Sequence, residues 1–133
     1  MSTMEITESA LLQCLSLSLR PFDSAHSLPS LTEQEWAQVL ALADRHEVLP
    51  LLETVLGDVE LPPALRSAME WKTAETVHQS LRLQALTEKL TRLLREADIT
   101  AITLKGCAVA RFYPVPEFRK TSDIDLFVSN GED

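Results

Sequence analysis

The feature that most constrains the fold is an apolar run at 99–104 that stops abruptly at Lys105-Gly106. The run predicts a buried strand, and the segment 107–112 has the length of one or two helical turns. A glycine between a buried strand and a helix lets backbone N–H groups approach a phosphate, and Lys105 adds a positive charge. The alternative is that Gly106 only makes a tight turn.

A second strand is predicted from Asp123 onwards, with Asp123 and Asp125 at alternate positions. Side chains alternate between the faces of a strand, so both carboxylates are expected on one face, about 7 Å apart along the backbone. The other face, directed to a core, would hold Ile124, Leu126 and Val128. Aspartate is depleted in strands, and Mg²⁺ binds one or two carboxylates together with substrate phosphates. The pair therefore indicates a metal site, with two solvated acids as the alternative.

Arg119 precedes this pair by a few residues and is a candidate phosphate ligand. A guanidinium can contact a triphosphate through two parallel hydrogen bonds. The alternative for Arg119 is a salt bridge to Asp123 or Asp125.

These motifs in order resemble a bacterial nucleotidyltransferase-like family of the DNA polymerase beta superfamily that is itself uncharacterised. The residues that carry the resemblance are Leu104-Lys105-Gly106, Tyr113-Pro114, Arg119 and Ser122-Asp123-Ile124-Asp125-Leu126-Phe127-Val128. A helical motif at 45–52 resembles the same family. The chain would be its N-terminal part, ending just after the Asp-x-Asp motif.

The resemblance implies a function and a set of site residues. Asp123 and Asp125 would be catalytic and would hold two Mg²⁺ ions, while Lys105, Gly106 and Arg119 would bind the phosphates. The reaction would transfer a nucleoside monophosphate from an NTP, expected to be ATP, to an unknown acceptor.

The chain also departs from the family pattern. Cys107 stands where serine or glycine is common, and the third carboxylate of the superfamily would lie on a later strand. Glu132 and Asp133 follow Val128 too closely to supply it. We therefore expect an enzyme in the full-length protein, and a catalytic set that is incomplete in this 133-residue chain, which alone would be inactive. The alternative is a non-catalytic helical interaction module with a remnant nucleotide site.

Composition limits the partners. The chain has 20 acidic and 12 basic residues and a net charge of −8, which disfavours nucleic-acid binding. No apolar run approaches the ~18 residues of a membrane span, and the N-terminus lacks the basic start of a signal peptide. The two cysteines, Cys14 and Cys107, are too far apart in sequence to indicate a disulfide scaffold. We expect a cytoplasmic protein that does not bind membranes.

We expect an α+β fold that is predominantly α-helical, with an N-terminal helical region at 1–60. Residues 61–133 would hold one long helix and the first two strands of a polymerase-beta-like nucleotidyltransferase core. Periodicity and capping signals predict helices at 5–19, 33–46, 50–56 and 64–97, the second opened by a capping box of Thr32 and Glu35.

One apolar seam is predicted along the long helix. Its members step by three and four, and they are Leu83, Leu86, Leu90, Leu93 and Ala97. Because a two-stranded sheet is marginal, we expect its exposed edge to pair, for example with a second copy of the chain.

Overall fold

The computed structural model describes residues 2–20 and 27–129, so Glu132 and Asp133 lie outside the described residues. The fold is α+β and predominantly helical, as predicted. Its elements are α1 (Thr3–Leu19), α2 (Glu33–Arg45), α3 (Leu49–Glu53), α4 (Pro63–Glu96), β1 (Thr100–Leu104), α5 (Gly106–Ala110), the 3₁₀ helix η1 (Pro116–Phe118) and β2 (Asp125–Ser129).

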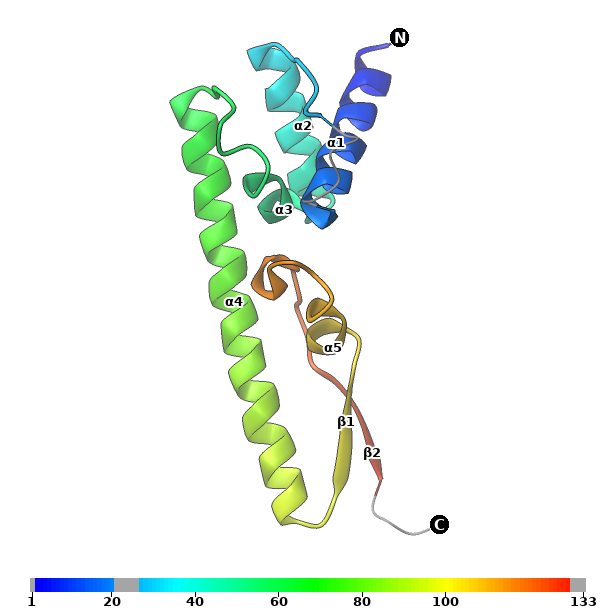
Figure 1. The fold of residues 1–133 in the computed structure, drawn as a ribbon. Helices are drawn as coiled ribbons and strands as arrows, with labels where there is room; N and C mark the ends of the chain where they lie inside the picture. Colours follow the sequence, from blue (N-terminus) through cyan, green and yellow to red (C-terminus); the bar gives the residue numbers. More distant parts are fainter. Residues whose placement is uncertain (1, 21–26, 130–133) are drawn as a thin grey trace. The chain divides into compact units, whose positions relative to one another are not determined.

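The chain divides into two compact units, Met1–Glu75 and Thr76–Asp133, and α4 runs through both (Figure 1). The domain boundary expected at residue 60 stays a prediction. Within the described residues, no helix is both long enough and apolar enough to cross a membrane.

Side-chain caps begin the first two helices. The Ser2 hydroxyl accepts from the Glu5 N–H at 3.2 Å, and the Glu5 carboxylate accepts from the Ser2 N–H at 2.8 Å, which completes a capping box on α1. The Thr32 hydroxyl accepts from the Glu35 N–H at 3.2 Å, as predicted. The reciprocal bond expected from Glu35 does not form, so α2 has half of the predicted box.

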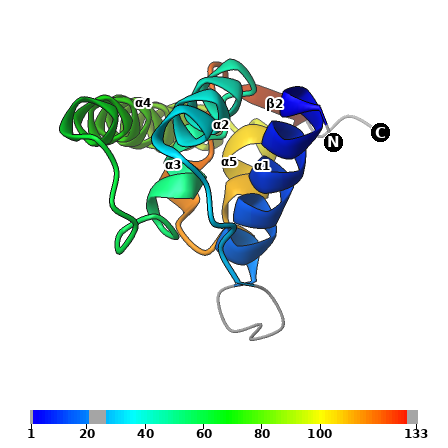
Figure 2. The same ribbon diagram turned by 90° about the horizontal axis from the view of Figure 1, so that it is seen from above.

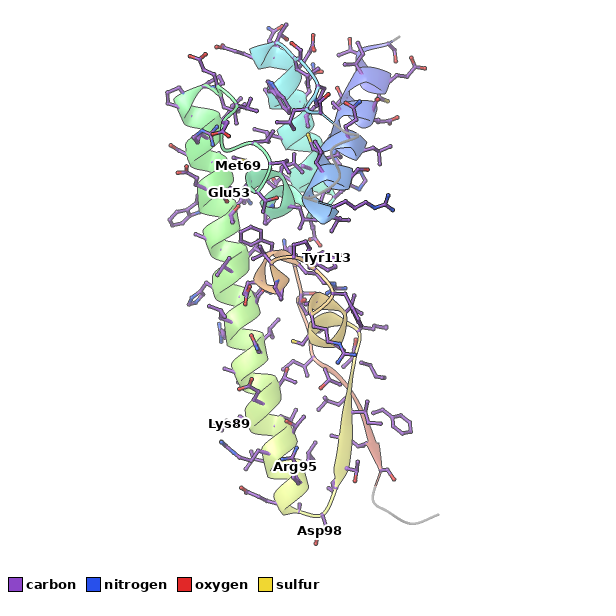
Figure 3. All side chains as sticks on the ribbon, viewed as in Figure 1. Glu53, Met69, Lys89, Arg95, Asp98 and Tyr113 are labelled. Atoms are coloured by element: carbon purple, nitrogen blue, oxygen red, sulfur yellow. The ribbon has the colours of Figure 1, made fainter. Side chains whose placement is uncertain are left out.

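The first unit contains the well-packed core of the described chain. Helices α1 and α2 lie side by side and α3 contacts both (Figures 1 and 2). Met69 brings the first part of α4 into the same core (Figure 3). The largest fully buried side chains are Leu52, Leu56, Met69, Val39 and Cys14. Each large apolar side chain contributes about 1.5–3 kcal/mol on full burial, so this core stabilises the unit without help from disulfides.

Two helices end on residues with positive φ. Glu47 after α2 and Asp98 after α4 both have φ of 60°. In each case the next residue closes the helix with a backbone hydrogen bond, from Val48 N–H to Ala43 O at 2.9 Å and from Ile99 N–H to Leu94 O at 2.8 Å. Asp98 therefore marks the turn from α4 into β1, where the sequence predicted the helix to end (Figure 3).

The second unit contains a two-stranded antiparallel sheet made of β1 and β2. Thr100 lies opposite Ser129, Ile102 opposite Phe127, and Leu104 opposite Asp125. Residues directly opposite each other in an antiparallel pair share a face. The register therefore puts the side chains of all three pairs on one face, which we call the outer face.

The prediction that β1 is buried is wrong for this outer face. Ile102 is 56% exposed and Leu104 is 44% exposed, whereas Ala101 and Thr103 on the opposite face are half-buried. A strand is buried on both faces only where other elements cover both, and the described elements cover one. Val128, expected in a core, is 53% exposed although it pairs with Ala101 on the opposite face, so the burial of that face does not extend to this position of β2.

The predicted seam of α4 does not face a core either. Leu86, Leu90 and Leu93 are all exposed. In this part of the helix the buried residue is Thr87, with Leu83 and Leu94 half-buried on the same side. The less exposed side of this part of α4 therefore carries both polar and apolar residues, and most of the predicted leucine seam lies on a more exposed side.

Candidate functional site

The sheet register brings the two predicted motifs to one end of the sheet. Leu104, the last residue of β1, lies opposite Asp125, the first residue of β2. The Lys105-Gly106 turn leaves β1 at the end where Asp123 leads into β2. A Cβ placed on Gly106 would lie 3.7 Å from the main-chain oxygen of Asp123, which confirms that the two segments are in contact.

The turn itself is closely packed and strained. A Cβ on Gly106 would stand 2.8 Å from Thr121 Cγ2, closer than real side-chain contacts allow, so glycine is required by the approach of Thr121. Lys105 has φ of 50° and ψ of −139°. This left-handed conformation is rare for a residue with a side chain and is characteristic of backbone strain at functional sites.

The two acids differ in position. Asp125 is half-buried at the start of β2, whereas Asp123 is exposed and precedes the strand, so strand alternation applies only from Asp125 onwards. Among the described residues, neither carboxylate has a hydrogen bond or an ion pair. The same part of the chain has no group of three or more His, Cys, Asp or Glu residues placed to hold a metal ion.

Arg119 contacts the segment that leads to the acids. Its Nη1 donates to Thr121 Oγ1 at 2.9 Å and, at a longer 3.5 Å, to the main-chain oxygen of Lys120. The salt bridge to Asp123 or Asp125 that we considered does not form within residues 27–129. The guanidinium therefore stabilises the loop before β2.

Arg119 also lines a pocket of about 200 Å³. The other lining residues are Ser80, Gln84, Cys107, Ala110, Arg111, Pro116, Glu117 and Thr121. The half-buried Cys107 thiol lies 3.9 Å from the hydroxyl of Thr87. Among the described residues, the thiol of Cys107 contacts the hydroxyl of Thr87, which is not a general base. The geometry therefore favours a packing role for this cysteine.

Two residues of α4 hold the segment before β2, and sequence reasoning missed both. Gln79 Nε2 donates to the main-chain oxygen of Thr121 at 3.0 Å. Ser80 Oγ lies 3.0 Å from the main-chain oxygen of Glu117 and 3.2 Å from that of Arg119. The only signal for them is a polar pair just before the leucine repeat begins, and polar residues within a long helix normally face solvent.

The comparison with known families decides the classification. Residues 32–132 match the sequence profile of a family described as uncharacterised nucleotidyltransferase, which is more than half of the chain. The chain belongs to this nucleotidyltransferase family. No curated protein and no solved structure matches the sequence. Membership of the nucleotidyltransferase family confirms the resemblance drawn from the motifs between Leu104 and Val128, and it supports a general nucleotidyltransferase role.

Proposed function

We propose that this chain carries the nucleotide-binding corner of a metal-dependent nucleotidyltransferase. The enzyme would transfer a nucleoside monophosphate from an NTP, such as ATP, to the hydroxyl of an acceptor. The observation that carries the proposal is the pairing of Leu104 with Asp125, because it places the Lys105-Gly106 turn beside the two acids.

The acids fit a hard divalent cation. Asp123 and Asp125 offer carboxylate oxygens, the ligands that Mg²⁺ prefers, and the described residues leave both without a competing partner. We propose that these two side chains hold Mg²⁺, with two ions in a complete site. Bound Mg²⁺ would lower the pKa of the acceptor hydroxyl and stabilise the negative charge of the departing pyrophosphate.

The remaining site residues would bind the phosphates. Lys105 would contribute a charge, and Gly106 would let phosphate oxygens approach the backbone where no side chain intervenes. The guanidinium of Arg119 has further N–H groups beyond the one bonded to Thr121, so it can also contact an anion. As the acceptor oxygen bonds to the α-phosphorus, the bond from that phosphorus to the pyrophosphate would break. The positive charges of Lys105 and Arg119 would hold the pyrophosphate in line with the attacking oxygen.

The resemblance to the DNA polymerase beta superfamily implies that turnover needs a third carboxylate. Within residues 2–20 and 27–129 no third acid joins Asp123 and Asp125. We therefore propose that this chain binds a metal–nucleotide complex and that turnover needs a further carboxylate.

The test is calorimetry of Mn²⁺ and of Mg·ATP with the wild-type chain and with Asp123→Asn/Asp125→Asn. Glu96→Gln, which changes an exposed acid at the end of α4, is the control because it removes a carboxylate charge away from the site. We expect binding to be lost in the Asp variant and kept in the control. Equal binding by wild type and the Asp variant, or no binding by either, would refute the proposal.

A second candidate is a non-catalytic interaction module with a remnant of the nucleotide site. The exposed leucines 86, 90 and 93 favour it, because an apolar stripe at helical spacing is suited to a partner helix. This candidate predicts a chain that binds no Mn²⁺ or Mg·ATP, so the same calorimetry separates the two.

A further inference from the structure

Three side chains on the outer face of the sheet form an apolar surface that is open to solvent. Ile102 and Leu104 of β1 and Phe127 of β2 are 56%, 44% and 59% exposed, and the register puts all three on one face. Asp125 pairs with Leu104 and therefore lies on this face as well. The apolar surface is thus continuous with the acid that we propose as a metal ligand.

We propose that this outer face binds the nucleoside part of the nucleotide, with the nucleobase stacked on the ring of Phe127. The inference rests on the proposed function, because it places the phosphates at Asp125. Phe127 is two residues beyond Asp125 on the same strand face, a separation of about 7 Å. A ribose can span that distance between a phosphate and its base.

The character of the surface favours a base over other ligands. An exposed aromatic ring stacks with any nucleobase through its π-face, and Ile102 directly opposite widens the apolar floor. The exposed leucine stripe on α4 is equally apolar, but residues 81–97 contain no aromatic side chain. Because stacking depends little on base identity, the platform predicts similar affinity for ATP and GTP.

The test compares a ligand with a base and a ligand without one. Mn·ATP and Mn·tripolyphosphate are titrated calorimetrically into wild type, Phe127→Ala and Phe127→Leu. Val128→Ala is the matched control, since Val128 is 53% exposed on the neighbouring position but pairs with Ala101 on the opposite face. Far-UV circular dichroism checks the fold of each variant, and Phe127→Leu keeps an apolar side chain should the alanine variant not fold.

We expect both Phe127 variants to bind Mn·ATP about 5- to 150-fold more weakly, the range for one lost base–aromatic stack. Binding of Mn·tripolyphosphate should not change, and Val128→Ala should alter neither titration. Equal weakening of both ligands, or unchanged binding of Mn·ATP, would overturn the platform while leaving the phosphate site in place.

Two other outcomes are also decisive. If wild type binds neither Mn·ATP nor Mn·tripolyphosphate, the proposed function fails, and the platform with it. If sedimentation velocity shows a wild-type dimer that Phe127→Leu converts to a monomer, the outer face is an interface between copies of the chain, which overturns the platform.

Discussion

Gly106 and Thr121 lie so close that a Cβ on the glycine would stand 2.8 Å from the Thr121 Cγ2 atom. Thr121 is itself only 7% exposed, and its hydroxyl accepts from Arg119 while its main-chain oxygen accepts from Gln79. The turn after β1 therefore packs against the segment that leads to the acids. Gly106 has a packing role that is separable from its proposed contact with phosphate.

Gly106→Ala should destabilise the chain by about 1–3 kcal/mol, the usual result of forcing a methyl group into an occupied space. Thr121→Ser removes Cγ2 but keeps the hydroxyl that accepts from Arg119. The double variant should therefore recover part of the loss. Urea unfolding of the four proteins gives the coupling between the two sites, and a double variant no more stable than the sum of the single changes would contradict the contact.

Lys105→Gly should raise the free energy of unfolding by about 1 kcal/mol, because strain at positive φ is worth about 1–3 kcal/mol and the entropy of the glycine offsets part of its relief. The same change should weaken binding of Mn·tripolyphosphate, since a charge is lost. Lys105→Ala is the control: it removes the charge but keeps φ of 50° unfavourable. An alanine variant as stable as the glycine variant would argue against backbone strain.

Much of the fold follows from local sequence signals. The leucine spacing, Pro62-Pro63 and Asp98 predict the long helix at 64–97, and it is found at Pro63–Glu96. These signals are local because capping, periodicity and proline stops act within a few residues. The same reasoning predicts the strand that ends before the Lys105-Gly106 turn and the strand that contains Asp125.

Local signals do not decide which face of an element is covered. The apolar residues of β1 predict burial on both faces, yet Ile102 is open to solvent. The leucine repeat of α4 predicts a buried seam, yet Thr87 occupies the buried position. Each outcome depends on contacts distant in sequence, such as the bond from Gln79 to a residue 42 positions later, which no window of sequence contains.

The order of the site motifs along the chain could be predicted, but their proximity in the folded structure could not. Lys105-Gly106 and Asp123 are brought together by the pairing of Leu104 with Asp125, and register is a property of the assembled sheet. The exposed aromatic ring of Phe127 on the same face as Asp125 follows from that register as well. Whether these residues bind phosphate and metal stays a prediction.

Burial raises the pKa of Cys14 from 9.0 to about 11, because a thiolate would lose its hydration in the core. The folded pKa is therefore above the unfolded one, so this group contributes stability below pH 9 that is lost as the pH rises from about 9 towards 11. At pH 10 we expect the wild type to lose about 1 kcal/mol more, relative to pH 8, than Cys14→Ala does. Urea unfolding of both proteins at the two pH values measures this, and parallel losses would contradict it.

Ser80→Ala should loosen the segment that leads to the acids. The hydroxyl of Ser80 is shared by the main-chain oxygens of Glu117 and Arg119, and its loss should cost about 1 kcal/mol. Hydrogen–deuterium exchange should become faster in the segment 117–123. Ser67→Ala is the matched control, since Ser67 is an exposed serine on the same helix.

The same variant tests whether α4 positions the proposed metal ligands. If it does, Ser80→Ala should weaken Mn²⁺ binding although Ser80 is not itself a proposed ligand. In the variant the segment 117–123 would be more flexible, and ordering it when the ion binds would reduce the affinity. Faster exchange with unchanged Mn²⁺ affinity would show that Asp123 and Asp125 are held by the β1–β2 pairing alone. In that case the role of Ser80 is restricted to stability.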